Sequence, residues 1–499
     1  MSIAYRDRVL PRPRLRGWRR PRRLRPVLVV LLIAFANNLA WALITPPFEG
    51  PDEYAHVAYA VDLAERGKAP TPTSPGNFTS TENVYALDAT RSFSVLGANA
   101  TRPPWSEGTR RLYDERVTRD RPARDNGGGG DITSATHGPI YYLLAAAGYL
   151  IAGGDFFTRM FGMRVASALL GALAAACVYG TVRELIPSRR WPAVTAGLLL
   201  AFQPMFGFMS GVVNADNGVN CAAAALIFLL VRGMRRGFTP RLAAAVPVVL
   251  VLGVFAKATM LALLPALALA LAVALWRRRL RLPGVLAMAA GLAGILVAWA
   301  IVAHVLGRPF LHVPTSPGPG GGAGGTLKQK IEYLWQVFLP PLPGMIDLYT
   351  GPGWVPAWTI YVREIWGVFG WASMPLPNRI FEAIFALLVV VAALALATVV
   401  RERAAVRERL PELAVLALAA IGVAVSVHLA FIRTSPFNSN IGEQGRYLFP
   451  AVTSAIVVMV GACYGLGRRF APLLATAMVS GMMLFCAGTQ LFEFRGYFT

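Results

Sequence analysis

Residues 26–44 read PVLVVLLIAFANNLAWALI, a run without charges that is apolar apart from Asn37 and Asn38 and that decides the fold class. A helix needs about 20 apolar residues to cross the hydrocarbon core of a bilayer, and this run meets that requirement. Similar runs recur along the 499 residues, of which 55% are hydrophobic and only 15% are charged. The mean hydropathy is +0.51. The composition therefore predicts an all-α polytopic membrane protein whose main solvent is the bilayer.

Clusters of basic residues set the expected orientation. The chain has 48 Lys and Arg against 26 Asp and Glu, a net charge of +22, and the basic residues fall in short clusters between apolar runs. This pattern is typical of topology signals rather than of a nucleic-acid-binding surface. The first 26 residues hold ten arginines and one acid, too basic and too long for the start of a cleavable signal. We expect residues 1–26 to form a cytoplasmic basic arm, with the chain emerging outside after Ile44.

The remaining apolar runs predict about eleven crossings in total. The run over 242–276 would be about 52 Å long as one helix, so we expect a hairpin that turns near Lys257 on the outside. The 13 apolar residues over 140–152 are too few to cross, and we expect a re-entrant or interfacial helix there. If that helix crossed, two arginine clusters would lie outside, against the positive-inside bias. The other spans are expected near 26–44, 160–182, 191–212, 217–232, 283–306, 377–400, 412–432, 447–466 and 470–492.

Long polar segments are expected only on the outer side. They cover 46–158 and 307–376 within a membrane domain over 27–492, and residues 493–499 form an external tail. The first segment contains the glycine run 127–130, and the second contains a Gly/Pro linker over 317–325. The second segment is also rich in tryptophan, which favours juxtamembrane helices at headgroup level. These tryptophans are Trp335, Trp354, Trp358, Trp366 and Trp371.

An acidic corner directly follows the first span. Residues 46–56 read PPFEGPDEYAH, and the prolines stop the helix so that Asp52 and Glu53 stay close to the membrane surface. A carboxylate there can act as a general base toward a hydroxyl or bind a divalent cation. The alternative is that Asp52 only caps a following helix that begins at Glu53.

This corner resembles the signature of the GT-C superfamily of membrane glycosyltransferases, an acidic pair in the first external loop. The resemblance implies a GT-C-like fold and transfer of a sugar from a polyprenyl phosphate. It also implies that an acid of the pair, matched here by Asp52 and Glu53, serves as the base toward the acceptor.

Three further motifs are similar to the same superfamily. Residues 136–142, THGPIYY, resemble its His/Pro/Pro-aromatic entry to a juxtamembrane helix, with Gly138 in place of the usual first proline. Asp216, in the expected external loop over 214–217, matches the position of a second acid, although it could also cap a helix. Residues 444–450, QGRYLFP, together with Lys257 and the Pro-Asp-Glu string, resemble an uncharacterised bacterial family of predicted GT-C-like multi-pass membrane proteins. The resemblance spans about residues 27–490.

Cations at the depth of the acids suit an anionic lipid headgroup. Arg446 can form a bidentate pair with phosphate oxygens, and Lys257 can approach as a point charge. Each could instead snorkel or pair with a neighbouring acid. His56 and His137 are candidates to orient phosphate or sugar, and Asn214 and Tyr447 complete the candidate binding set. Hard carboxylate oxygens suit Mg or Mn, so Asp52 and Asp216 would be the ligands if a divalent cation is used; no cofactor is required.

These features favour an inverting glycosyltransferase in a bacterial plasma membrane, with its site on the external face. Asp52 would deprotonate a hydroxyl of an envelope glycan, lipid or protein as the polyprenyl phosphate departs. The donor sugar and the acceptor cannot be read from the residues.

Three alternatives stay open. A transporter or flippase of envelope precursors also has many apolar spans with a few charges, although carriers usually place those charges near the midplane. A lipid-linked glycan polymerase or ligase would use the same donor class. A non-catalytic scaffold for envelope assembly would require the acidic pair to be dispensable.

Overall fold

The fold is seen in a computed structural model of the chain. It describes residues 25–70, 81–90, 105–122, 133–307, 326–345, 356–370, 373–434 and 444–498, with the side chains of 430–434 left out. Most of the expected basic arm, the glycine run 127–130, the linker 317–325, Trp354 and Trp371 lie outside these residues.

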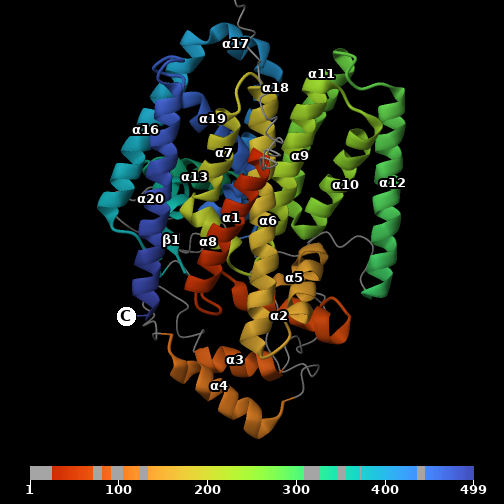
Figure 1. The fold of residues 1–499 in the computed structure, drawn as a ribbon, viewed down its shortest axis with the longest axis vertical. Helices are drawn as coiled ribbons and strands as arrows, with labels where there is room; N and C mark the ends of the chain where they lie inside the picture. Colours follow the sequence, from red (N-terminus) through yellow and green to blue (C-terminus); the bar gives the residue numbers. More distant parts are fainter. Residues whose placement is uncertain are drawn as a thin grey trace, which may run out of the picture.

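The described chain is a bundle of long helices with smaller helices gathered at one end (Figure 1). The 30-residue helix α6, Phe156–Leu185, packs against α1, α5, α7 and α9. The apolar helices of the bundle are α1 Pro26–Ile44, α6, α7 Trp191–Ala201, α8 Pro204–Ser210, α9 Asp216–Arg236, α10 Pro240–Ala256, α11 Leu264–Trp276, α12 Leu282–Val305, α16 Asn378–Arg401, α18 Leu410–Thr434, α19 Val452–Ala462 and α20 Ala471–Phe498. The short 3₁₀ helices η3 Ala258–Leu263 and η5 Gly445–Ala451 lead into α11 and α19.

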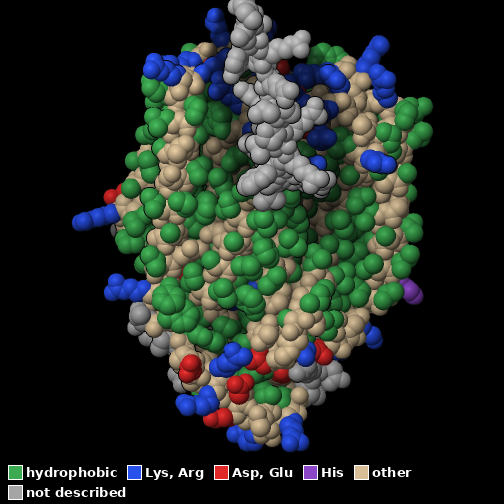
Figure 2. All heavy atoms as spheres, in the orientation of Figure 1, with side chains coloured by type: hydrophobic (Ala, Val, Ile, Leu, Met, Phe, Trp, Pro, Cys, Tyr) green, Lys and Arg blue, Asp and Glu red, His purple; other side chains and the backbone are tan. Residues whose placement is uncertain are grey.

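The helices confirm a polytopic membrane protein. Over the described ranges, nine helical segments are long and apolar enough to cross a bilayer, and α7 with α8, bent by 65°, makes a tenth candidate. The shorter α10 has 17 residues and corresponds to the remaining expected crossing. Figure 2 shows the hydrophobic side chains that cover the middle of one face, with charged side chains toward the two ends. Which end faces the cytoplasm stays a prediction.

The expected hairpin at Lys257 is present. Helix α10 ends at Ala256, the backbone of Lys257 is extended, and the chain continues through η3 into α11. The amide of Phe238 donates to the carbonyl of Arg279 over 2.8 Å. The start of the first limb and the end of the second therefore lie at the same end of the bundle.

The first polar segment folds into small helices at one end of the bundle (Figure 1). They are α2 Glu53–Arg66, α3 Thr81–Thr90, α4 Glu107–Asp120, η2 Thr133–Thr136 and α5 Ile140–Ala152. Helix α5 has 13 residues and packs against α6 at a glycine pair. A Cβ at Gly148 or at Gly162 would lie 2.3 Å from the carbonyl oxygen of the other, so this contact requires both glycines. Helix α5 stays at this end, as a helix too short to cross is expected to do.

The second polar segment, which is rich in tryptophan, also forms short elements. They are α13 Leu327–Phe338, α14 Pro356–Trp358, the π-helix η4 Thr359–Arg363, α15 Glu364–Trp366, and strands β1 Val368–Phe369 and β2 Met374–Pro375, which pair antiparallel. Helix α17, Arg403–Glu408, joins α16 to α18. Helix α13 buries Glu332, Tyr333, Gln336 and Val337, and a second apolar face, formed by Leu327, Ile331, Leu334 and Phe338, points away from the protein. That these elements lie at headgroup level stays a prediction.

Candidate functional site

A cavity of about 340 Å³ lies where α2, α9, η3 and η5 meet. Elements from both halves of the chain build it, because residues near position 52 and near position 446 share its wall. Its lining contains every residue of the sequence-predicted site except Glu53. These residues are Asp52, His56, His137, Asn214, Asp216, Lys257, Arg446 and Tyr447.

Asp52 faces this cavity and pairs with Arg446. Its backbone is left-handed, with φ 58° and ψ 10°, a conformation that residues other than glycine seldom adopt. Asp52 occupies the position before the first turn of α2, yet its side chain makes no capping hydrogen bond. Instead, its Oδ2 accepts from Nη2 of Arg446 over 2.6 Å. The carboxylate is 41% exposed, so it is open to a substrate as well as paired.

Asp216 forms the second acid–base pair of the cavity. It is the first residue of α9, the N-cap position before it is occupied by Ala215, and its side chain forms a salt bridge with Lys257. Asn214 connects this pair to the acidic corner, since its Nδ2 donates to the carbonyl of Pro51 over 3.0 Å. Its Oδ1 accepts from the amide of Asp216 over 2.9 Å. The helix-cap alternatives for Asp52 and Asp216 are therefore not what the structure contains.

The charges of the cavity compensate one another. Partial enclosure is the largest single influence and raises the pKa of Asp52, but the nearby positive charges, chiefly that of Arg446, and the hydrogen bond from Arg446 together outweigh it and hold that pKa below its usual range. Burial lowers the pKa of His56 to about 4 and that of His137 to about 3, so both rings are neutral near pH 7. The two rings are nearly parallel, with centroids 5.9 Å apart. Nδ1 of His56 lies 2.6 Å from the hydroxyl of Tyr142.

Tyr447 joins the two cations. Nζ of Lys257 lies 4.6 Å from the centre of its ring, and the guanidinium of Arg446 lies 5.0 Å from it. Cations at these distances are attracted by the face of an aromatic ring. Sequence reasoning missed the hydroxyls of Ser134, Thr259 and Ser426 in the same wall, because lone Ser and Thr residues in such segments carry no recognisable signal.

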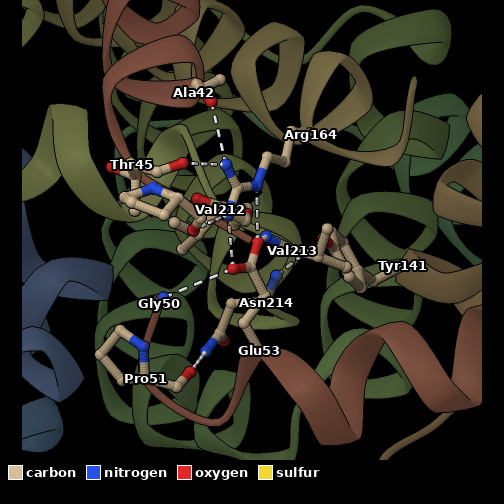
Figure 3. A network of polar contacts seen from close by, with 12 residues as sticks. Ala42, Thr45, Gly50, Pro51, Glu53, Tyr141, Arg164, Val212, Val213 and Asn214 are labelled. Carbon is tan, nitrogen blue, oxygen red and sulfur yellow. Dashed lines mark hydrogen bonds and ion pairs between the residues drawn. The ribbon is translucent and has the colours of Figure 1, made fainter. Parts of the chain in front are cut away.

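Glu53 lies outside the cavity, and the prediction that it is catalytic is not supported by its position. Its side chain is fully buried and forms an ion pair with Arg164 over 2.7 Å (Figure 3). Its Oε1 also accepts from the amide of Val213 over 2.9 Å. Because Glu53 begins α2 whereas Asp52 has a left-handed backbone, the two adjacent carboxylates point to different sides. Both oxygens of Glu53 are engaged within the protein and none lines the cavity.

Arg164 was missed by the sequence interpretation. It lies on α6, a helix apolar enough to cross a bilayer, and its side chain is only 4% exposed. The available signal was this isolated charge within a predicted span, because such charges almost always face a partner inside the protein.

A close backbone contact explains why position 138 is glycine rather than the proline that the motif usually has. A Cβ at this position would lie 2.1 Å from the carbonyl oxygen of Phe255, so neither alanine nor proline fits without a shift of the backbone. This contact brings the segment before α5 against the end of α10, directly before Lys257.

The two acids do not form an evident metal site. Each already pairs with a cation, Asp52 with Arg446 and Asp216 with Lys257. Within the described ranges, no group of three or more His, Cys, Asp or Glu side chains is placed to hold a metal ion. These donors do not fit a divalent cation in this arrangement, and no step below depends on one.

Comparison with known families decides the classification. A profile described as "Predicted membrane protein (DUF2142)" matches residues 35–455. The chain belongs to this DUF2142 family. The matched range contains every residue of the cavity lining. A search of curated proteins gives no match for this DUF2142 protein.

Several solved structures resemble this DUF2142 protein at low identity. The apo crystal structure of the Archaeoglobus fulgidus oligosaccharyltransferase aligns with 14% identity and a TM-score of 0.49, over 93% of this chain and 56% of that one. The DUF2142 chain thus spans little more than half the length of that enzyme. ArnT from Cupriavidus metallidurans bound to undecaprenyl phosphate aligns with 14% identity and a TM-score of 0.42, over 95% and 75% of the two chains.

Proposed function

We propose that this DUF2142 protein is an inverting glycosyltransferase that moves a sugar from a polyprenyl-phosphate donor to an envelope acceptor, on the external face of a bacterial plasma membrane. The observation that carries the proposal is a cavity in which an exposed carboxylate, Asp52, lies with two cations, Arg446 and Lys257. A base beside two phosphate-binding groups is what displacement of a phosphate by a hydroxyl requires.

The donor phosphate would bind between Arg446 and Lys257. Arg446 is 5% exposed and already donates to Asp52, so an incoming phosphate competes with that carboxylate for the guanidinium. Lys257 makes the same exchange with Asp216. As the bond to the sugar breaks, charge develops on the phosphate oxygen, and both cations stabilise it.

Asp52 would act as the general base. Its lowered pKa keeps it ionised near neutral pH, and its exposed carboxylate can accept the proton of an acceptor hydroxyl. The acceptor oxygen then forms a bond to the anomeric carbon while the bond from that carbon to the phosphate oxygen breaks. Because this is one displacement, the anomeric configuration inverts.

The neutral residues would orient the sugar. His56 and His137 keep uncharged rings in the wall, and an uncharged imidazole can both donate and accept a hydrogen bond. Asn214 and Tyr447 present polar groups to the same space. None of these groups repels an anionic donor.

The test is replacement of Asp52 by asparagine in protein reconstituted into nanodiscs. A panel of radiolabelled polyprenyl-phosphate hexoses and pentoses supplies the donor, and membranes of the source cells supply the acceptor. We expect D52N to lose transfer by at least about 10²-fold, the lower end for a general base. Binding of sugar-free polyprenyl phosphate should persist, because Arg446 is released from its acid.

Asp62 offers a matched control. It lies on α2, pairs with Arg66 over 3.1 Å, and does not line the cavity. D62N should retain transfer. Full transfer by D52N, or movement of the lipid across the membrane with no transfer by the wild-type protein, would overturn the proposal.

A further inference from the structure

Behind the cavity, a single arginine holds the end of helix α1 and the acidic corner together (Figure 3). Nη1 of Arg164 donates to the carbonyl of Ala42 over 2.9 Å and also to that of Thr45. Its Nη2 donates to the carbonyl of Pro46 over 2.8 Å. The last carbonyls of a helix lack partners within the helix, so Arg164 satisfies groups that would otherwise be buried and unpaired.

The same guanidinium forms a two-pronged contact with Glu53. Nε donates to Oε1 over 2.8 Å, and Nη2 donates to Oε2 over 2.7 Å. Glu53 in turn accepts from the amide of Val213 over 2.9 Å, in the segment between α8 and α9. The Glu53 carboxylate therefore ties the corner to α6 and to the segment that carries Asn214.

The opposite side of the corner is held from within the cavity. The carbonyl of Pro51 accepts from Nδ2 of Asn214 over 3.0 Å and from Nη1 of Arg446 over 3.3 Å. Asp52 thus lies between two anchored neighbours, Pro51 on the cavity side and Glu53 on the buried side. Because the backbone of Asp52 is left-handed, the direction of its carboxylate depends on the contacts that hold both Pro51 and Glu53.

We infer that Arg164 and Glu53 are positioning residues that aim the Asp52 carboxylate at the reacting atoms without touching substrate. This inference rests on the proposed function. A side chain that only stabilised the fold could sit anywhere along the α1–α6 contact. Arg164 instead holds Glu53, which directly follows the proposed base, and the three carbonyls that lead into its loop.

The test compares R164K, on α6, and E53Q, on α2, with a control variant on α6. Glu184, near the far end of α6, is 4% exposed and pairs with Arg232 over 2.8 Å and with Arg236 over 2.6 Å. E184Q therefore removes an equally buried carboxylate from α6, at a distance from the cavity. Each variant is reconstituted as the full chain, and its thermal midpoint, its affinity for sugar-free polyprenyl phosphate, its kcat and its kcat/KM against pH are measured.

We expect R164K and E53Q to lose kcat by about 10²-fold, as displacement of a reacting group by about 1 Å can cause. Affinity for polyprenyl phosphate should stay within about threefold of the wild type, because both cations remain. The acid limb of kcat/KM, which reports the free protein in which Asp52 pairs with Arg446, should move to higher pH, since an Asp52 that leaves Arg446 loses the charge that lowers its pKa. E184Q should lower the thermal midpoint and leave this limb in place.

The outcomes separate the inference from the proposed function. If D52N retains full transfer, the base assignment fails and the inference fails with it. If D52N is inactive but R164K and E53Q keep the wild-type acid limb, and lose activity only in proportion to folded protein, the inference alone fails. Should both variants fail to fold, E53D keeps the charge but withdraws the carboxylate by one methylene. The same movement of its acid limb would support the inference, and an unmoved limb would overturn it.

Discussion

The two ends of helix α6 hold acid–arginine contacts of different kinds. Near the cavity, Arg164 and Glu53 are 4% and 0% exposed, and the guanidinium also binds three backbone carbonyls. Near the far end, Glu184 pairs with Arg232 and Arg236, which are 41% and 56% exposed. An enclosed pair fixes geometry because no water can replace a missing partner, whereas exposed arginines can exchange their partner for solvent.

The largest expected effect comes from removing one arginine at each end of α6. R164A leaves Glu53 buried without its cation, so we expect a loss of about 3–5 kcal/mol in the free energy of unfolding. R232A removes a half-exposed arginine and leaves Glu184 with Arg236, so we expect about 0–1 kcal/mol. Denaturant unfolding in detergent measures both. Equal losses at the two ends would contradict the contrast.

The next largest effect concerns activity at the cavity end. R446A removes a cation that we propose stabilises the departing phosphate, and we expect kcat to fall about 10²–10³-fold, as when one oxyanion donor is lost. The matched control is R468A, because Arg468 also binds a carboxylate, that of Glu402 over 2.7 Å, but is 74% exposed and away from the cavity. Transfer rates of purified protein decide the matter, and a comparable loss in R468A would mean that the effect is not local.

Acidification should loosen the cavity end selectively. The pKa values of His56 and His137, about 4 and about 3, lie below the ordinary value of 6.5, so the folded state binds fewer protons than the unfolded state. Stability is then fully present above pH 6.5 and is lost as the pH falls toward 4, by about 1.4 kcal/mol for every tenfold difference in proton affinity between the two states. Hydrogen exchange at pH 7 and pH 5 should show lost protection in α2 but not in α17. H56Q should weaken the pH dependence, and an unchanged profile would count against the buried neutral ring.

The smallest expected effect tests how closely the cavity wall is packed. G138A places a methyl group 2.1 Å from the Phe255 carbonyl oxygen, and we expect a loss of about 1–3 kcal/mol. At Gly481, in α20, a Cβ meets nothing within 4 Å, so G481A should be neutral or stabilising by up to about 1 kcal/mol. Thermal midpoints of the two variants give the comparison. A stable G138A would show that α5 can move away from α10.

The membrane crossings could be predicted because the thickness of the hydrocarbon core of the bilayer fixes both the length and the composition of a helix that crosses it. The hairpin at Lys257 followed from a run too long for one bilayer. The 65° bend between α7 and α8 did not, because the stretch over 191–212 is long and apolar enough to pass as one span. Pro204 is the only local sign of it, and a proline also occurs inside the continuous helix α10.

Site prediction succeeded where polar residues stood out against apolar surroundings. Asp52, Asp216, Lys257 and Arg446 all interrupt or border apolar runs, and the structure brings them to one cavity. The role of Glu53 could not be separated from that of Asp52, because a left-handed residue turns neighbouring side chains to different sides and sequence does not encode that turn directly. The partner of Arg164 was equally hidden, since it lies 111 residues away along the chain.

The contact between Arg446 and Pro51 joins residues 395 positions apart. During synthesis, the ribosome must therefore translate the chain as far as Arg446 before the wall of this cavity can close. A nascent chain that has inserted only its earlier helices would present Asp52 without its arginine. Under the proposed function, such an intermediate would lack one of the two cations that hold the donor phosphate, so the site would be completed late in biogenesis.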